Sequence, residues 1–300
     1  MKFFSIERDK QRNKTNFRFL GYRILSISKS DKKYKRQIAT MQKEINNLHN
    51  LMNYAIDIRS IPVATGNIRD IQLKSSKILE KIDIICKKHD IKYWIDFGTL
   101  LGAVRHKGFV PWDDDIDICL LRDDYEKLRE ILKSNFLNTD ISVREVGFIN
   151  HFQIRVSQDD NLVGIDIFPV DKYFTSKISE EEKICLNERI KKAQELLKER
   201  CLKNDNFKND INAVKKYIKH LNKDVIQCGT LDNVDTPLLY YGIDWAHTYK
   251  NNTIKFDTIF PLSEIAFEGK KFPCPNRVEE HLSNLYGKYN CFPKCIYREV

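Results

Sequence analysis

The stretch Pro111-Trp112-Asp113-Asp114-Asp115-Ile116-Asp117-Ile118 holds four carboxylates within five residues and runs into the apolar segment Cys119-Leu120-Leu121. This alternation followed by a solid apolar run predicts a buried β-strand. Alternate side chains of a strand share one face, so Asp115 and Asp117 point the same way, and Asp113 joins them if the strand begins early. Carboxylates this close repel one another and need a partner. Oxygen ligands of this kind suit Mg²⁺ or Mn²⁺.

A later segment, Gly164-Ile165-Asp166-Ile167-Phe168-Pro169, repeats the theme with one carboxylate inside an apolar run. An isolated buried aspartate is costly unless a cation or a metal compensates its charge. We therefore place Asp166 on a neighbouring strand beside Asp115 and Asp117, where it completes a three-carboxylate site. Asp171 lies near the end of this strand and is expected to be solvated.

Gly98 and Thr99 follow a short predicted strand, residues 92–96, and open a predicted helix. A glycine at such a corner lets a backbone N–H and a hydroxyl approach a phosphate closely. Arg105 and His106 then supply cations between this corner and the carboxylates, and a guanidinium can clamp a phosphate. The order of these elements suits phosphoryl transfer, in which a metal offsets phosphate charge.

Other interpretations of the same residues remain open. An acidic run by itself is most often a solvated loop or a helix cap. An Asp-x-Asp metal site also occurs in sugar-nucleotide glycosyltransferases. What favours phosphoryl transfer is the ordered set of Gly-Thr, Arg-His, the acidic run and a third aspartate on a strand, because the whole set is far less expected by chance than any part of it.

The formal charge of +9 over 300 residues is concentrated at the N-terminus. Residues 1–36 carry 12 Lys and Arg against 3 Asp and Glu, a net of +9, so the remaining residues are neutral overall. Aromatic and cationic residues are interleaved in Phe17–Leu25, which predicts contact with an anionic membrane surface; a solvated arm or a nucleic-acid-binding tail is the alternative. No stretch approaches the length of a membrane span. A heptad-like apolar spacing over Ile38–Ala55 predicts a helix that packs on the body or dimerises.

The eight cysteines lie far apart, without a Cys-x-x-Cys pair. With no clean signal peptide, this indicates reduced thiols in a cytoplasmic protein. Cys274, His281, Cys291 and Cys295 could be considered zinc ligands, but their spacing fits no standard finger. We therefore interpret them as separate residues.

The whole segment Gly98–Ile118 resembles the signature of the LicD family, which includes bacterial phosphocholine transferases and is related to the fukutin group. Weaker similarity extends to Ile259–Leu262, Phe267–Gly269 and Leu285–Gly287, so the resemblance covers roughly residues 90–290. It implies an α+β fold of the nucleotidyltransferase type, akin to the DNA polymerase β superfamily, with a mixed sheet flanked by helices. The N-terminal helical arm lies outside the resemblance. We expect a basic N-terminal arm and amphipathic helix over 1–66, a nucleotidyltransferase-like catalytic core over 67–178, and a helical insertion with the C-terminal part of the same domain over 179–300.

The resemblance also implies an activity: metal-dependent transfer of a phospho-alcohol from CDP-choline or another CDP-alcohol to a hydroxyl of a surface glycan, such as lipopolysaccharide, capsule or teichoic acid. Asp115, Asp117 and Asp166 match its metal-binding and catalytic carboxylates, Asp113 a further acidic position, and Gly98 with Thr99 the phosphate-binding turn. The acceptor could be lipid-linked, with the enzyme peripheral on the inner face of the cell membrane, and no specific nucleic acid is expected. A glycosyltransferase and an inactive scaffold protein are the alternative functions.

Overall fold

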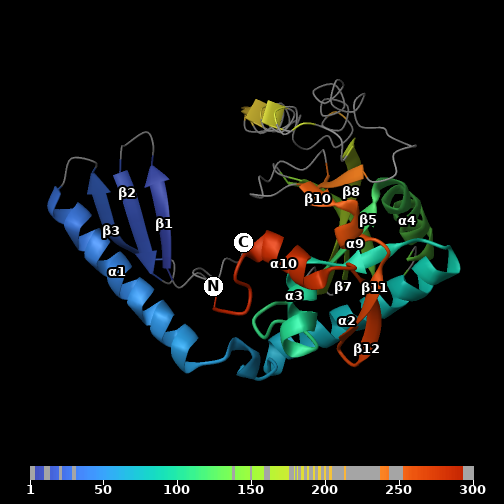
Figure 1. Ribbon diagram of the computed structural model, residues 1–300, viewed down its shortest axis with the longest axis horizontal. Coiled ribbons are helices and arrows are strands. Elements are labelled where there is room, and N and C mark those ends of the chain that lie inside the picture. The colour runs from blue at the N-terminus through green and yellow to red at the C-terminus, as the bar shows by residue number, and fades with distance from the viewer. Residues whose placement is uncertain are drawn as a thin grey trace. The chain divides into compact units, whose positions relative to one another are not determined.

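The structure is a computed structural model. It describes residues 4–9, 14–19, 22–28, 32–136, 139–148, 151–158, 163–175, 237–242 and 253–292, with scattered residues between 179 and 213. The chain divides into two compact units (Figure 1). Unit 1 comprises residues 1–61 and 288–300, and unit 2 comprises residues 62–287.

Unit 1 begins with a three-stranded antiparallel sheet, where the sequence predicted a basic arm. Its strands are β1 (Phe4–Asp9), β2 (Lys14–Phe19) and β3 (Tyr22–Ser28). The register sets Ile6 opposite Phe17, and Phe17 opposite Leu25. The consecutive charges Glu7-Arg8-Asp9 interrupt the period of two that a strand would show, so the sequence alone did not indicate strands here.

The predicted helix follows as α1 (Lys32–Ala55). Its apolar stripe stays largely in solvent: Met41, Ile45, Leu48 and Met52 are all exposed. A short 3-10 turn, η1 (Ile58–Ser60), ends the first part of the unit. The chain returns to α1 at Phe292, whose backbone N–H and carbonyl oxygen both contact side chains of this helix. Its N–H donates to Asn53 Oδ1 at 2.6 Å, and its carbonyl oxygen lies 2.7 Å from His49 Nε2.

None of the helices in the described part of the chain combines the length and the apolar character needed to cross a lipid bilayer.

Unit 2 contains a mixed sheet and flanking helices. Its helices are α2 (Gly66–Lys88), α3 (Phe97–His106), α4 (Arg122–Asn135), α9 (Phe256–Ile259) and α10 (Val278–Tyr286). Its strands are β4 (Tyr93–Ile95), β5 (Asp115–Leu121), β6 (Ser142–Phe148), β7 (His151–Gln158), β8 (Val163–Thr175), β9 (Pro237–Tyr241), β10 (Thr253–Lys255), β11 (Ser263–Phe267) and β12 (Lys270–Cys274). Described residues between 181 and 203 are helical, as predicted, and most of the predicted helical span up to residue 225 lies outside the described residues.

The long strand β8 organises the main sheet, whose order is β10-β9-β8-β5-β4. Strand β5 runs parallel to β8 along one edge. The other edge of β8 is shared: β7 pairs with its first half, and β9 pairs with its second half. Strand β6 pairs with β7, while β11 and β12 form a separate hairpin. This architecture confirms the predicted α+β class with a mixed sheet flanked by helices; the superfamily assignment stays a prediction.

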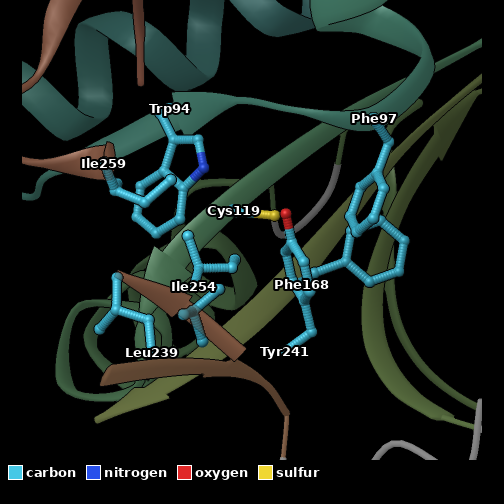
Figure 2. Close-up of a cluster of buried hydrophobic side chains, with 9 residues drawn as sticks. Trp94, Phe97, Cys119, Phe168, Leu239, Tyr241, Ile254 and Ile259 are labelled. Carbon is cyan, nitrogen blue, oxygen red and sulfur yellow. The ribbon is translucent and has the colours of Figure 1, made fainter. Parts of the chain in front are cut away.

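Alternation along β5 and β8 gives the two faces of the sheet different roles. One face carries Cys119 of β5 and Phe168 of β8 in a buried cluster (Figure 2). The other members of this cluster come from β4, α3, β9, β10 and α9 and from the middle of β8: Trp94, Phe97, Val170, Leu239, Tyr241, Ile254 and Ile259. Burying each large apolar side chain contributes roughly 1.5–3 kcal/mol. Asp117 and Asp166 precede Cys119 and Phe168 by two residues each, so they share this face.

The opposite face of β5 carries Ile116, Ile118 and Leu120, all fully buried, and helices α2 and α4 pack against β5 and β8. Arg122, the first residue of α4, forms an ion pair with Asp171 of β8, with 2.7 Å between Nη2 and Oδ2. Asp171 is only 8% exposed. The expectation of a solvated Asp171 was therefore wrong, because a cation from the adjacent helix takes the place of water.

Candidate metal centre

Three aspartates meet where β5 and β8 run side by side. The parallel register sets Asp117 directly opposite Asp166. Asp115 precedes Asp117 by two residues and lies on the same face. One carboxylate oxygen from each of the three lies within 4.8 Å of the others. The structure thus brings together the three residues that the sequence analysis singled out from separate segments.

Asp113 lies in a turn before the strand, because β5 begins only at Asp115. Its N–H donates to the carbonyl oxygen of Val110 at 2.9 Å. Asp113, Asp114 and Asp115 form a second group of carboxylates whose oxygens lie within 4.8 Å of one another. Asp115 belongs to both groups, so Asp113 extends the acidic cluster through Asp115.

The electrostatics of this acidic cluster disfavour ionisation in the absence of a cation. Burial raises the pKa of Asp117 well above its usual value, and the charges of Asp115 and Asp166 raise it further. Burial and the adjacent Asp115 likewise raise the pKa of Asp113. Like charges without a neutralising partner destabilise a fold, so a bound cation would stabilise the ionised cluster. An all-carboxylate donor set suits hard divalent ions such as Mg²⁺ or Mn²⁺.

The start of α3 forms the corner beside the acidic cluster. The N–H of Gly98 donates to Asp117 Oδ2 at 3.2 Å, and the N–H of Asp117 donates to Thr99 Oγ1 at 2.7 Å. A Cβ at position 98 would lie 2.5 Å from Asp113 Oδ2, so a side chain there would displace the Asp113 carboxylate. Gly98 and Thr99 thus hold Asp117 in place; their predicted role in binding a phosphate stays a prediction.

Arg105 and His106 lie in the last turn of α3, one helix length from the corner. The Arg105 side chain is buried, while His106 is half-buried. A guanidinium in the last turn of a helix interacts favourably with the helix dipole, which gives Arg105 a structural function here. The predicted contact of Arg105 and His106 with donor phosphates stays a prediction.

Two side chains of α2 support the loop that carries the acidic cluster. Gln72 donates from Nε2 to the backbone carbonyl oxygen of Asp113 at 2.7 Å. Arg69 forms a two-pronged ion pair with Glu268, whose Oε1 also accepts from the N–H of Phe109 at 3.2 Å. A side chain at Gly108 would collide with the Glu268 carboxylate. The β11–β12 turn, which contains Glu268, therefore clamps the start of the acidic loop to α2.

Sequence reasoning missed Asp96, which lies between β4 and α3 and is fully buried. Its Oδ1 accepts from the N–H of Phe97 and from His281 Nε2, both at 2.7 Å. Its Oδ2 accepts from Trp94 Nε1 at 2.9 Å and from the Tyr241 hydroxyl at 2.8 Å. Burial opposes ionisation of Asp96, but His281 and these hydrogen bonds hold its pKa below the usual value.

Asp96 had one local signal that could have identified it. An aspartate directly before a helix is a common N-cap, and here its side chain does accept from the first helical N–H. Its distant donors leave no signal in a single sequence. The same network also accounts for His281, considered above as a zinc ligand, because its Nε2 faces Asp96. Among the described residues, the groups suited to a metal are the two aspartate groups.

Comparison with known proteins identifies similar sequences. Residues 90–197 match the LicD family, described as the LicD/FKTN/FKRP nucleotidyltransferase domain. The chain is 28% identical to the lipopolysaccharide cholinephosphotransferase LicD of Haemophilus influenzae, over 75% of this chain and 92% of that protein. It is 34% identical to an uncharacterized protein of Rickettsia typhi over 35% of each chain. It is 28% identical to the mouse ribitol 5-phosphate transferase FKRP, over 26% of this chain and 17% of that protein.

The matched region begins before β4 and includes β5, β8 and the corner at Gly98, so it contains all three converging aspartates. Two of these relatives are named as transferases of phospho-alcohols, in agreement with the predicted enzyme class. The resemblance noted from Gly98–Ile118 is thereby confirmed, and the similarity to the LicD family spans residues 90–197 of this chain.

Proposed function

We propose that this protein is a metal-dependent phosphotransferase that moves a phospho-alcohol from a CDP-linked donor to a hydroxyl of a cell-surface glycan. The observation that carries the proposal is the convergence of Asp115, Asp117 and Asp166 beside the Gly98 corner. Further support comes from the similarity to the lipopolysaccharide cholinephosphotransferase of Haemophilus influenzae over most of both chains. The nucleotidyltransferase-like superfamily is part of this proposal.

The three aspartates would hold the cation, which would offset the negative charge of the donor phosphates. Asp166 would help to remove the proton from the acceptor hydroxyl, because general bases in such sites are positioned carboxylates. The acceptor oxygen then forms a bond to the phosphorus that carries the alcohol. The bond from this phosphorus to the oxygen of CMP breaks, and CMP leaves. Arg105 and Thr99 would steady the phosphates.

The relatives suggest which alcohols to test. One is named for choline phosphate and another for ribitol 5-phosphate. We propose choline as the first candidate, since that similarity covers much more of the chain. Glycerol and ethanolamine are the further donors to test.

The test measures nucleotide release from purified protein with glycan acceptor and Mn²⁺ or Mg²⁺. CDP-choline, CDP-ribitol, CDP-glycerol and CDP-ethanolamine are compared with UDP-sugars, and products are identified by mass spectrometry. Release of CMP together with a phospho-alcohol on the glycan supports the proposal. Release of UDP instead identifies the glycosyltransferase alternative, and failure to bind either metal or CDP revives the scaffold alternative. Near-normal turnover by Asp115→Asn would overturn the assignment of the site.

We also propose that unit 1 contacts an anionic membrane surface on the cytoplasmic side, which would bring the enzyme to a lipid-linked acceptor. Support comes from the net charge of +9 over residues 1–36 and from the exposed apolar side chains of α1. A basic segment next to exposed apolar side chains favours binding to anionic lipid. Dimerisation through the same helix is the competing explanation.

Vesicle sedimentation tests this contact. The protein should bind vesicles containing phosphatidylglycerol, bind phosphatidylcholine vesicles weakly, and be released by high salt. Leu48→Glu, on the apolar stripe of α1, should weaken binding, whereas Asn47→Glu adds the same charge next to it and should weaken binding less. Equal sedimentation with both lipids, or equal effects of the two variants, would contradict the proposal.

A further inference from the structure

Asp96 is hydrogen-bonded to the backbone of Asp117, a residue of the candidate metal centre. Its backbone N–H donates to the carbonyl oxygen of Asp117 at 3.1 Å. The next residues, Phe97 to Thr99, form the corner that contacts Asp117 through the Gly98 N–H and the Thr99 hydroxyl. Residues 96–99 therefore hold Asp117 by its carbonyl oxygen, its amide and its carboxylate. Any displacement of Asp96 would be transmitted to Asp117 by three separate hydrogen bonds.

The backbone between Asp96 and Gly98 has an unfavourable conformation. Phe97 has φ of 43°, in the left-handed region that residues with a side chain rarely adopt. Such a conformation persists only where the surroundings over-determine it, and it clusters at functional sites. Here one hydrogen bond and two ring contacts fix Phe97. The Asp96 carboxylate accepts from the Phe97 N–H, and the Phe97 ring packs against Phe168 and Tyr241, with centroids 5.2 and 4.8 Å away.

The donors that fix Asp96 come from elements far along the chain. Tyr241 is at the end of β9, and His281 is on α10. Tyr241 contributes twice, because its ring contacts Phe97 and its hydroxyl donates to Asp96. His281 Nε2 also lies 3.1 Å from the Tyr241 hydroxyl, so the two donors are joined to each other. Both residues are almost completely buried.

We propose that Asp96, Tyr241 and His281 are positioning residues that hold the Gly98 corner in its strained form and thereby keep Asp117 in the geometry that binds a divalent cation. The inference rests on the proposed function in one respect, namely that the acidic cluster binds such a cation. Outer partners of metal ligands orient the ligands, and their loss typically reduces metal affinity by about 10–100-fold. The predicted effect of breaking this network is a loss of cation affinity that exceeds what lowered stability alone explains.

The test is a Mn²⁺ titration of the full chain, with free Mn²⁺ followed by electron paramagnetic resonance and thermal unfolding measured in parallel. Tyr241→Phe keeps the ring and removes the hydroxyl, and should weaken Mn²⁺ binding several-fold, towards about 10-fold. His281→Leu removes a donor and should weaken it at least as much. His281→Gln offers a new N–H donor and should recover part of the affinity.

Leu282→Ala is the matched control, because Leu282 is the fully buried neighbour of His281 on α10 and is apolar. It should lower the melting temperature as much as the other variants while leaving the Mn²⁺ dissociation constant within about twofold of the wild-type value. If His281→Leu does not fold, Tyr241→Phe and His281→Gln decide the outcome.

Two results would overturn the inference, and they can be told apart. If the wild-type protein binds Mn²⁺ and the folded Tyr241→Phe and His281 variants bind it equally well, the positioning role is wrong and the proposed function is untouched. If the wild-type protein binds no Mn²⁺, the proposed metal site is wrong and the inference is lost with it.

Discussion

Asp96 and Asp117 are carboxylates joined by one backbone hydrogen bond, yet their surroundings are opposite. Asp96 accepts hydrogen bonds from four donors, which hold its pKa below the usual value although burial opposes this. Asp117 is surrounded by other carboxylates, which together with burial raise its pKa. Burial alone therefore does not define a functional carboxylate. Asp96 has its compensating donors within the protein, whereas Asp117 has few and would be stabilised in its ionised form by a bound cation, as proposed above.

The largest expected effect is that of Asp117→Asn. We expect transfer activity to fall by more than about 100-fold, beyond the usual loss for an outer partner of a metal ligand. We also expect the metal-free protein to be at least as stable as the wild type, because the substitution removes like-charge repulsion. Nucleotide release and thermal unfolding in EDTA measure the two effects. Asp70→Asn, at an exposed position on α2, is the control. A clear loss of metal-free stability in Asp117→Asn would remove the contrast with Asp96.

Asp96→Asn should behave in the opposite way and destabilise the protein even without metal. Replacing one carboxylate oxygen by an NH₂ group leaves up to two of the four buried donors without an acceptor, at about 1–3 kcal/mol each. Urea denaturation at neutral pH measures the free energy of unfolding. Asp83→Asn is the comparison, since Asp83 accepts from Tyr93 and Lys87 at a less buried position, and should cost about 1–3 kcal/mol. Equal losses in both variants would mean that Asp96 is an ordinary buried acceptor.

Glu268→Gln tests a third carboxylate of intermediate character, paired with Arg69 and only partly buried. We expect a stability loss of about 1.5–3 kcal/mol, the usual contribution of hydrogen bonds to charged groups. Because Glu268 also holds the N–H of Phe109, we expect a modest loss of activity through the acidic loop. Denaturation and nucleotide release provide the two readings, and Glu264→Gln on the same hairpin is an exposed control. Unchanged stability would show that the clamp is dispensable.

The smallest expected effect concerns the pH dependence of stability, whose direction should differ between Asp117 and Asp96. The folded-state pKa values of Asp113 and Asp117 are raised, so their contribution to stability is present at low pH and is lost as pH rises from about 4 through the raised values. The folded-state pKa of Asp96 is lowered, so its contribution is present above pH 4 and is lost as pH falls.

Melting temperatures from pH 4 to 8, with EDTA or Mn²⁺, test this difference. Mn²⁺ should raise the melting temperature more at pH 8 than at pH 5, because protons compete with the ion. The gain should disappear in Asp117→Asn. A Mn²⁺ effect that is independent of pH, or that persists in this variant, would place the ion elsewhere.

The acidic cluster could be predicted because its signals are local. A period of two over Asp115–Leu121 and an aspartate inside an apolar run place both segments on buried strands, and a buried carboxylate requires an opposite charge or a bound cation. Asp96 could not be recognised in the same way. Two of its donors lie 145 and 185 residues further along the chain, and no period or spacing connects them.

Two further differences have physical causes that a single sequence conceals. Residues 4–9, 14–19 and 22–28 form strands where we expected a basic arm, because consecutive charges such as Glu7-Arg8-Asp9 lack the period of two that indicates a strand. Asp171 was expected to be solvated, but Arg122 meets it from a helix that the sequence places far away. In both cases the deciding partner belongs to another element.

The position of His281 on α10, near the end of unit 2, has a consequence for the folding of the newly made chain. Strands β5 and β8 emerge from the ribosome well before α10, so the aspartates can meet while the last donor to Asp96 is still untranslated. Until that helix docks, the corner lacks one of the contacts that hold it. A nascent or prematurely terminated chain would therefore carry the acidic residues before the contacts to Asp96 are complete. The corner at Gly98 would gain its full set of contacts only when almost the whole of unit 2 has been made.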